Sequence, residues 1–201
     1  LWSSARSAHL GTAAALVVLA LSLPGRRRWA ALAGMAAVGA AALATPSVQQ
    51  RFLSLLQPGA EETRRNLWLS SIHAIADRPW LGYGQGNFQR MMETHRVEGY
   101  YDTLAHSHND FLMHGVNAGL LGLAAALLLL GVTTVLLWRG RKGLGRRAWI
   151  PVAAVACQVG ISVSGLFQVY QTDNEVEMVL YFLLGAAFAV IAPDRATTGH
   201  H

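Results

Sequence analysis

Long apolar segments separated by arginine-rich turns constrain this chain more than any other feature. A helix that crosses a bilayer needs about 20 mostly apolar residues, with about 17 as the lower limit. Only 13% of the residues are charged, about half the share found in soluble domains. The sequence therefore predicts an all-α fold, a polytopic membrane helix bundle with about five transmembrane helices. The apolar segments run over residues 10–23, 29–44, 111–138, 149–167 and 176–192.

The positions of the basic residues predict how such a bundle is oriented. Short cytoplasmic loops carry an excess of Lys and Arg. With five spans, three short basic stretches fall on one side, which is then cytoplasmic: 26–28, 139–147 and Arg195. We expect a single domain, with two transmembrane helices in 1–46, a periplasmic loop with an amphipathic helix in 47–108, three transmembrane helices in 109–193 and a cytoplasmic tail in 194–201. Because the basic residues lie between apolar spans, the positive charge predicts membrane topology, and no nucleic acid is expected as a partner.

The long loop predicts a helix over 61–77, which Pro79 ends. Arg64 and Arg65 lie near the start of this helix, where the macrodipole disfavours cations. Either an anionic ligand or the neighbouring Glu61 explains them. The three glycines that follow are spaced G-x-G-x-G after a helix, which does not fit a nucleotide-binding fingerprint and favours a tight turn.

The richest polar cluster lies just before the third apolar segment and contains His106, His108, Asn109, Asp110 and His114. If a helix begins here, His108, Asn109 and Asp110 occupy its first turn, where backbone N–H groups favour an anion. A zinc site is an alternative, although the spacing is not H-E-x-x-H and no cysteine assists. Histidines that only cap the helix or lie at the membrane interface are a second alternative.

Several short motifs follow one another along the chain. They are Ser3–Ala8 around Arg6, Arg64-x-x-x-Trp68, the segment Asp77–Phe88 with PWLGYGQGNF, the segment Ala105–Leu112 with HSHNDFL continuing to Gly119–Gly122, and the segment Gly165–Glu175. In this order they resemble the O-antigen ligase family, also called the Wzy C-terminal type. Ala5 stands where the family usually has serine, but the arginine that follows is present. Members carry more spans than are predicted here, so we expect a C-terminal portion of a larger membrane protein.

The resemblance implies a metal-independent glycosyltransferase that uses no cofactor. Its donor is a polyprenyl-pyrophosphate-linked glycan, and its acceptor hydroxyl lies on lipid A-core or another glycan. Arg6 and Arg64 match the arginines that hold the pyrophosphate, and His108 matches the essential histidine. Arg65, His106 and Asn109 are supporting candidates. The implied location is the bacterial inner membrane, with the active face in the periplasm and the lipid bilayer as a further partner.

Other functions stay open at this level. A polymerase of the same superfamily uses the same donor, and a protein O-oligosaccharyltransferase is a third member of the group. A polysaccharide transporter would carry ionisable residues within its spans, and these spans are nearly free of them. A lipid phosphatase would be expected to show a P-S-G-H segment, which does not occur. A purely structural membrane module is the remaining alternative.

Overall fold

The computed structural model describes residues 3–46, 49, 62–101, 103–170 and 174–192, with backbone only for residues 3–6. Within this part of the chain the secondary structure is helical and no strand occurs, which confirms the predicted all-α class. The elements are α1 (Ser3–Ser22), α2 (Arg26–Leu43), α4 (Glu62–Asp77), α5 (Phe88–His95), α6 (Asp110–Gly140), a 3₁₀ helix (Gly145–Ala148), α7 (Trp149–Ser164) and α8 (Asn174–Ile191).

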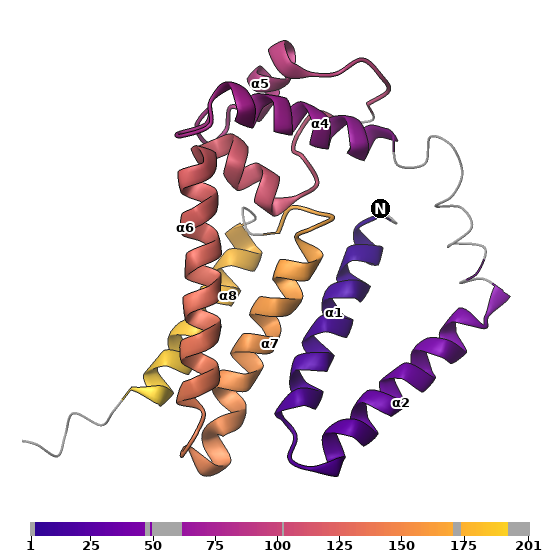
Figure 1. Ribbon diagram of the computed structural model, residues 1–201, viewed down its shortest axis with the longest axis vertical. Helices are drawn as coiled ribbons and strands as arrows, with labels where there is room; N and C mark the ends of the chain where they lie inside the picture. Colours follow the sequence, from indigo (N-terminus) through magenta and orange to yellow (C-terminus); the bar gives the residue numbers. More distant parts are fainter. Residues whose placement is uncertain (1–2, 47–48, 50–61, 102, 171–173, 193–201) are drawn as a thin grey trace, which may run out of the picture.

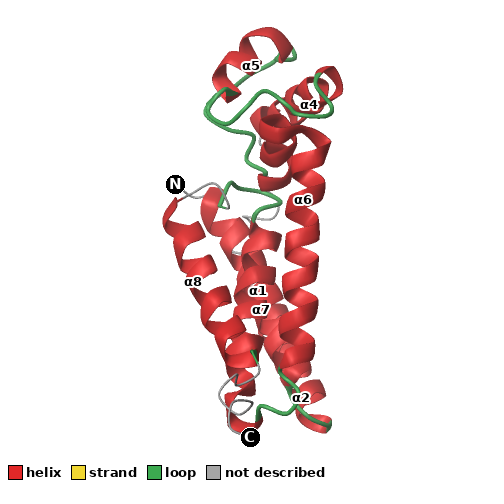
Figure 2. Cartoon of the chain, turned by 90° about the vertical axis from the view of Figure 1, so that its left-hand side faces the viewer, coloured by secondary structure: helices red, strands yellow, loops and turns green. Residues whose placement is uncertain are grey.

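The helices form an upright bundle that is capped at one end (Figure 1). α7 packs against α1, α6 and α8. α2 contacts α1 and buries none of its residues. α4 and α5 lie across one end of the bundle, and the α1–α2 and α6–α7 turns lie at the other (Figures 1 and 2). The polar loop and the arginine-rich turns are therefore separated by the length of the bundle.

Three helical stretches are long and apolar enough to cross a membrane: 110–140, 145–164 and 174–191. Their large apolar side chains point outward in many places; Leu128 is 67% exposed and Phe182 is 74% exposed. A lipid-facing surface has this character, because hydrocarbon rather than water surrounds it. The chain is thus a helical membrane protein. The apolar helix over 7–22 is shorter, and the spanning role of α1 and α2 stays a prediction.

Small residues hold α1 against α7. Ser7, Gly11 and Ala15 recur every fourth residue on one side of α1 and meet Gly160 and Ser164 of α7. A Cβ atom at Gly11 would overlap the Ser164 hydroxyl and the Gly160 carbonyl. Close backbone approach of this kind is the usual way in which helices associate inside a membrane. It places the first turn of α1 beside the end of α7.

α6 is broken at Gly119, whose φ of 66° and ψ of −166° are not helical. One arm covers residues 110–118 and the other covers 120–140. The apolar run over 111–138 predicts a span, and the helix there is long and apolar enough to be one, but it is interrupted at Gly119. The short arm instead lies under α4, at the capped end of the bundle (Figure 1).

The turn that follows α4 docks into this break. The backbone N–H of Leu120 donates to the Pro79 carbonyl (2.6 Å), and that of Tyr83 donates to the Val116 carbonyl (2.7 Å). A side chain at Gly119 would overlap the Trp80 carbonyl. The backbone groups that the break removes from the helix ladder are therefore satisfied by the turn, as buried groups must be.

The predicted loop helix is present as α4, and its expected first residue, Glu61, lies outside the described residues. α5 was not predicted. It buries Phe88, Met91 and Met92 against Leu67 of α4. The glycine-rich segment before it favoured a turn, and the helix that follows is only eight residues long.

Candidate functional site

The start of α6 presents the predicted polar cluster in an unexpected way. Asn109 is the N-cap, and its Oδ1 accepts a hydrogen bond from the Leu112 backbone N–H (2.9 Å). Its Nδ2 donates to the Leu166 carbonyl (3.0 Å) in the turn after α7. Of the three residues expected in the first helical turn, only Asp110 is there; His108 and Asn109 precede the helix. Asn109 is thus a capping residue that also joins two elements.

His108 has a strained backbone. Its φ is +53°, and it is the only non-glycine residue with positive φ in the described part of the chain. L-residues avoid this region, and a non-glycine residue held there costs on the order of 1–3 kcal/mol. The surrounding hydrogen bonds maintain this conformation: Ser107 Oγ donates to the Asn109 carbonyl (2.8 Å). The imidazole meets Gln168 in the turn that follows α7.

Gln168 is the partner of the His108 ring. Its Oε1 lies 2.5 Å from His108 Nδ1. An amide oxygen only accepts, so Nδ1 carries the proton and Nε2 of the neutral ring has a free lone pair. This is the tautomer that a general base needs. The sequence motifs include the segment Gly165–Glu175, but they did not single out Gln168, because nothing in a local pattern pairs it with a residue 60 positions away.

The imidazoles of His106 and His108 meet edge to face, with ring centroids 4.3 Å apart. The His108 backbone N–H donates to His106 Nδ1 (3.3 Å). Burial lowers the pKa of His106 below its ordinary value, and a charge on His108 lowers this pKa further. His106 is therefore disfavoured as a second cation beside His108.

This pKa direction predicts how stability depends on pH. The unfolded chain binds a proton at His106 near the ordinary pKa of 6.5, whereas the folded chain binds it only at lower pH. The free energy of unfolding therefore decreases as the pH drops below about 6.5 toward the lower pKa of the folded state. Well above pH 6.5 His106 is neutral in both states and causes no pH dependence. We expect the Tm of the detergent-solubilised protein to fall between about pH 7.5 and about pH 5.5. The fall should be smaller in His106→Asn, and equal falls in both proteins would contradict the assignment.

Asp110 connects the start of α6 to the turn after α7. Its backbone N–H donates to the Gly165 carbonyl (2.8 Å), and its Oδ1 accepts from the Tyr170 backbone N–H (2.9 Å). A side chain at Gly165 would overlap the buried Asp110 carboxylate. The Tyr170 hydroxyl in turn lies 3.1 Å from Ser7 Oγ of α1. The starts of α1 and α6 and the turn over 165–170 are thus held together.

α4 reaches the same turn from above. The ring of Trp68 packs on Phe167, with centroids 6.3 Å apart. Arg64 lies one helical turn before Trp68 and therefore on the same face of α4. It is half-buried, whereas Arg65 is exposed. Phe167 contacts α4, and the next residue, Gln168, contacts His108. The turn after α7 therefore links the two.

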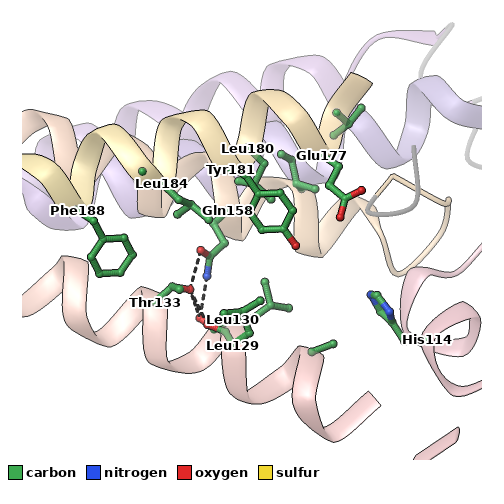
Figure 3. Close-up of a pocket in the computed structure, with 14 residues that line it drawn as sticks. His114, Leu129, Leu130, Thr133, Gln158, Glu177, Leu180, Tyr181, Leu184 and Phe188 are labelled. Atoms are coloured by element: carbon green, nitrogen blue, oxygen red, sulfur yellow. Dashed lines mark hydrogen bonds between the residues drawn. The ribbon is translucent and has the colours of Figure 1, made fainter. Parts of the chain in front are cut away.

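The remaining site residues are placed as follows. Arg6 has its backbone in the first turn of α1, next to Ser7, and its side chain lies outside the described part. His114, a residue of the zinc alternative, lines a different feature, an apolar cavity of about 280 Å³ between α6, α7 and α8 (Figure 3). Among the described residues no three His, Cys, Asp or Glu side chains gather as a metal site would require.

The comparison with protein families shows which family the chain belongs to. A family model described as O-antigen ligase matches residues 1–127, which is more than half of the chain. The chain belongs to the O-antigen ligase family. No curated protein matches it. Membership confirms the resemblance carried by the motifs and places the chain among membrane enzymes of glycan ligation and polymerisation.

The O-antigen ligase match includes Arg6, Arg64 and His108 and ends within α6. α7, α8 and the turn over 165–170 lie beyond it. Gln168 and Tyr170, which hold the site together, therefore come from outside the residues that the family model matches. A motif search restricted to the family segment would not find them.

Proposed function

We propose that the protein transfers a glycan from a polyprenyl-pyrophosphate carrier to an acceptor hydroxyl, as an O-antigen ligase with lipid A-core as the acceptor. The observation that carries the proposal is the His108–Gln168 pair, together with the packing of Trp68, on the arginine-bearing helix α4, against Phe167 in the same turn as Gln168. A base and a cation are the two kinds of group that this reaction needs.

In this mechanism His108 Nε2 accepts the proton of the acceptor hydroxyl. The acceptor oxygen forms a bond to the anomeric carbon of the glycan. The bond from that carbon to the pyrophosphate oxygen breaks, and the leaving pyrophosphate takes the electron pair. Arg64 and Arg6 stabilise the charge that develops on it, because guanidinium groups stay protonated and can bind phosphate oxygens in a fork. No metal or cofactor enters these steps.

The proposal places the capped end of the bundle in the periplasm of a bacterium and the arginine-rich turns in the cytoplasm, within the inner membrane. Residues 47–108 then form the periplasmic loop. The positive-inside rule supports this orientation, since the short basic turns lie at the end opposite α4. Lipid-linked glycans presented on the periplasmic side would meet His108 and Arg64 there.

Reconstitution of the full-length protein in vesicles tests this function. We expect that vesicles holding the polyprenyl-pyrophosphate glycan and lipid A-core yield glycan joined to lipid A-core and release polyprenyl pyrophosphate. A longer carrier-linked chain instead would identify a polymerase. A glycosylated protein acceptor would identify a protein O-oligosaccharyltransferase. No new glycosidic bond with any acceptor would favour a transporter or a structural membrane module.

A further inference from the structure

Four large apolar side chains are exposed together beside the break in α6. Trp80 is 66% and Leu81 75% exposed, and Leu120 and Leu121 are 45% and 55% exposed. The backbones of 79–81 and 119–120 are in contact, which places the two pairs of exposed side chains on neighbouring segments. We call these four side chains the apolar collar. None of the four takes part in the site around His108.

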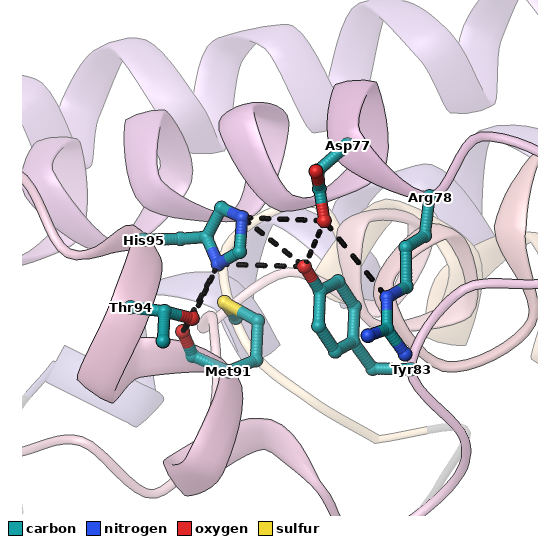
Figure 4. Close-up of polar contacts among 6 residues, drawn as sticks. All are labelled: Asp77, Arg78, Tyr83, Met91, Thr94 and His95. Atoms are coloured by element: carbon teal, nitrogen blue, oxygen red, sulfur yellow. Dashed lines mark hydrogen bonds and ion pairs between the residues drawn. The ribbon is translucent and has the colours of Figure 1, made fainter.

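The collar is held rigidly. The Tyr83 hydroxyl donates to Asp77 Oδ2 (2.6 Å) and lies 3.1 Å from His95 Nε2, which joins the turn to α4 and α5 (Figure 4). The Arg78 guanidinium lies 4.4 Å from the Tyr83 ring centroid. A side chain at Gly82 would overlap the Val116 carbonyl of α6. The exposure of Trp80 and Leu81 is therefore a built feature of the turn.

The position of the collar along α6 indicates what covers it. The long arm, residues 120–140, is roughly 31 Å long at about 1.5 Å per residue. This matches the roughly 30 Å of a bilayer's hydrocarbon core. Its first residues, Leu120 and Leu121, therefore lie at the upper boundary of that core. Leu127 and Leu128 continue the exposed apolar surface below them.

Tryptophan is enriched at this boundary, because its ring is apolar and its N–H can still reach water or a headgroup. We propose that Trp80 and Leu81 insert into the lipid interface of the leaflet at the α4 end, beside the first turn of the long arm of α6. The collar thereby anchors the end of α4 to the membrane. A glycan platform is the competing use of an exposed tryptophan, but the indole N–H is the only side-chain hydrogen-bonding group in the collar.

Quenching of tryptophan fluorescence tests this anchor. The full-length protein, Trp80→Phe and Trp68→Phe are reconstituted in phosphatidylcholine vesicles, with and without bromine on the acyl chains. Subtracting the fluorescence of each variant from that of the unsubstituted protein gives the signal of one tryptophan. We expect the Trp80 signal to lose most of its intensity in brominated vesicles and to resist iodide in the buffer. The Trp68 signal should change much less, because this side chain is covered by the turn over 165–170.

Two outcomes would overturn the proposal. If iodide quenches the Trp80 signal and brominated lipid does not, the collar faces water. If a soluble glycan acceptor changes the Trp80 signal while brominated lipid leaves it unchanged, the collar is a sugar platform. A second variant, Leu81→Asp, keeps the tryptophan and adds a charge to the surface. It should make Trp80 accessible to iodide, and unchanged shielding from iodide would also contradict the anchor.

Discussion

Replacing His108 with alanine is expected to abolish glycan transfer while the protein remains folded in the membrane. General-base catalysis by a positioned side chain contributes about 10²–10⁴-fold. Gln168, the hydrogen-bond partner of His108, is an amide and cannot replace it as the base. The measurement is the initial rate of transfer in vesicles. Alanine tolerates the positive φ of 53° less well than histidine and loses the hydrogen bond to Gln168, so the Tm of the variant is measured beside its rate.

Two further variants separate catalysis from general damage. His73 is an exposed histidine of α4, and His73→Ala should transfer glycan at the normal rate. Gln168→Ala leaves His108 in place but removes the acceptor that orients it, so we expect a partial loss of rate and an altered pH profile. A His108→Ala protein with near-normal transfer would exclude His108 as the base. An unchanged pH profile in Gln168→Ala would exclude Gln168 as its positioning residue.

Replacing Arg64 with alanine is expected to reduce transfer by about 10²–10³-fold, the usual loss when one group that stabilises developing negative charge is removed. Arg64 shares a face of α4 with Trp68, and Trp68 packs on Phe167. Phe167 is the neighbour of Gln168, the partner of His108, so this face is directed to the turn that holds the proposed base. Arg64→Lys should recover part of the rate, because it restores the charge without the planar fork. Rates at saturating donor separate this effect from weaker donor binding.

Arg65 provides the matched control, since it is the next residue of the same helix and the same substitution removes the same charge. It lies on the exposed face of α4 with Leu69 and Ile72. We expect Arg65→Ala to retain most of the transfer rate. Equal losses in Arg64→Ala and Arg65→Ala would show that the loop's overall charge matters and would contradict a specific role for Arg64.

The sequence by itself was sufficient to predict the helical membrane class, the α4 helix and the family. The length of each apolar segment and the positions of the arginines can be read from the sequence alone. Each segment must satisfy its own backbone hydrogen bonds in the bilayer, so its helical state does not depend on the other segments. The motifs around Arg64 and His108 lie within contiguous stretches, so they too can be read along the chain. Their roles in catalysis stay predictions.

Only the tertiary structure decided what completes the site. Gln168 meets His108 across 60 positions, and Tyr170 binds Asp110 across the same separation. Such contacts depend on how α6, α7 and α1 pack, and no local pattern encodes them. The break at Gly119 was also invisible, because a glycine in an apolar run is compatible with a continuous helix until another segment takes over its hydrogen bonds. Here the turn after α4 does so, and α4 packs against α6.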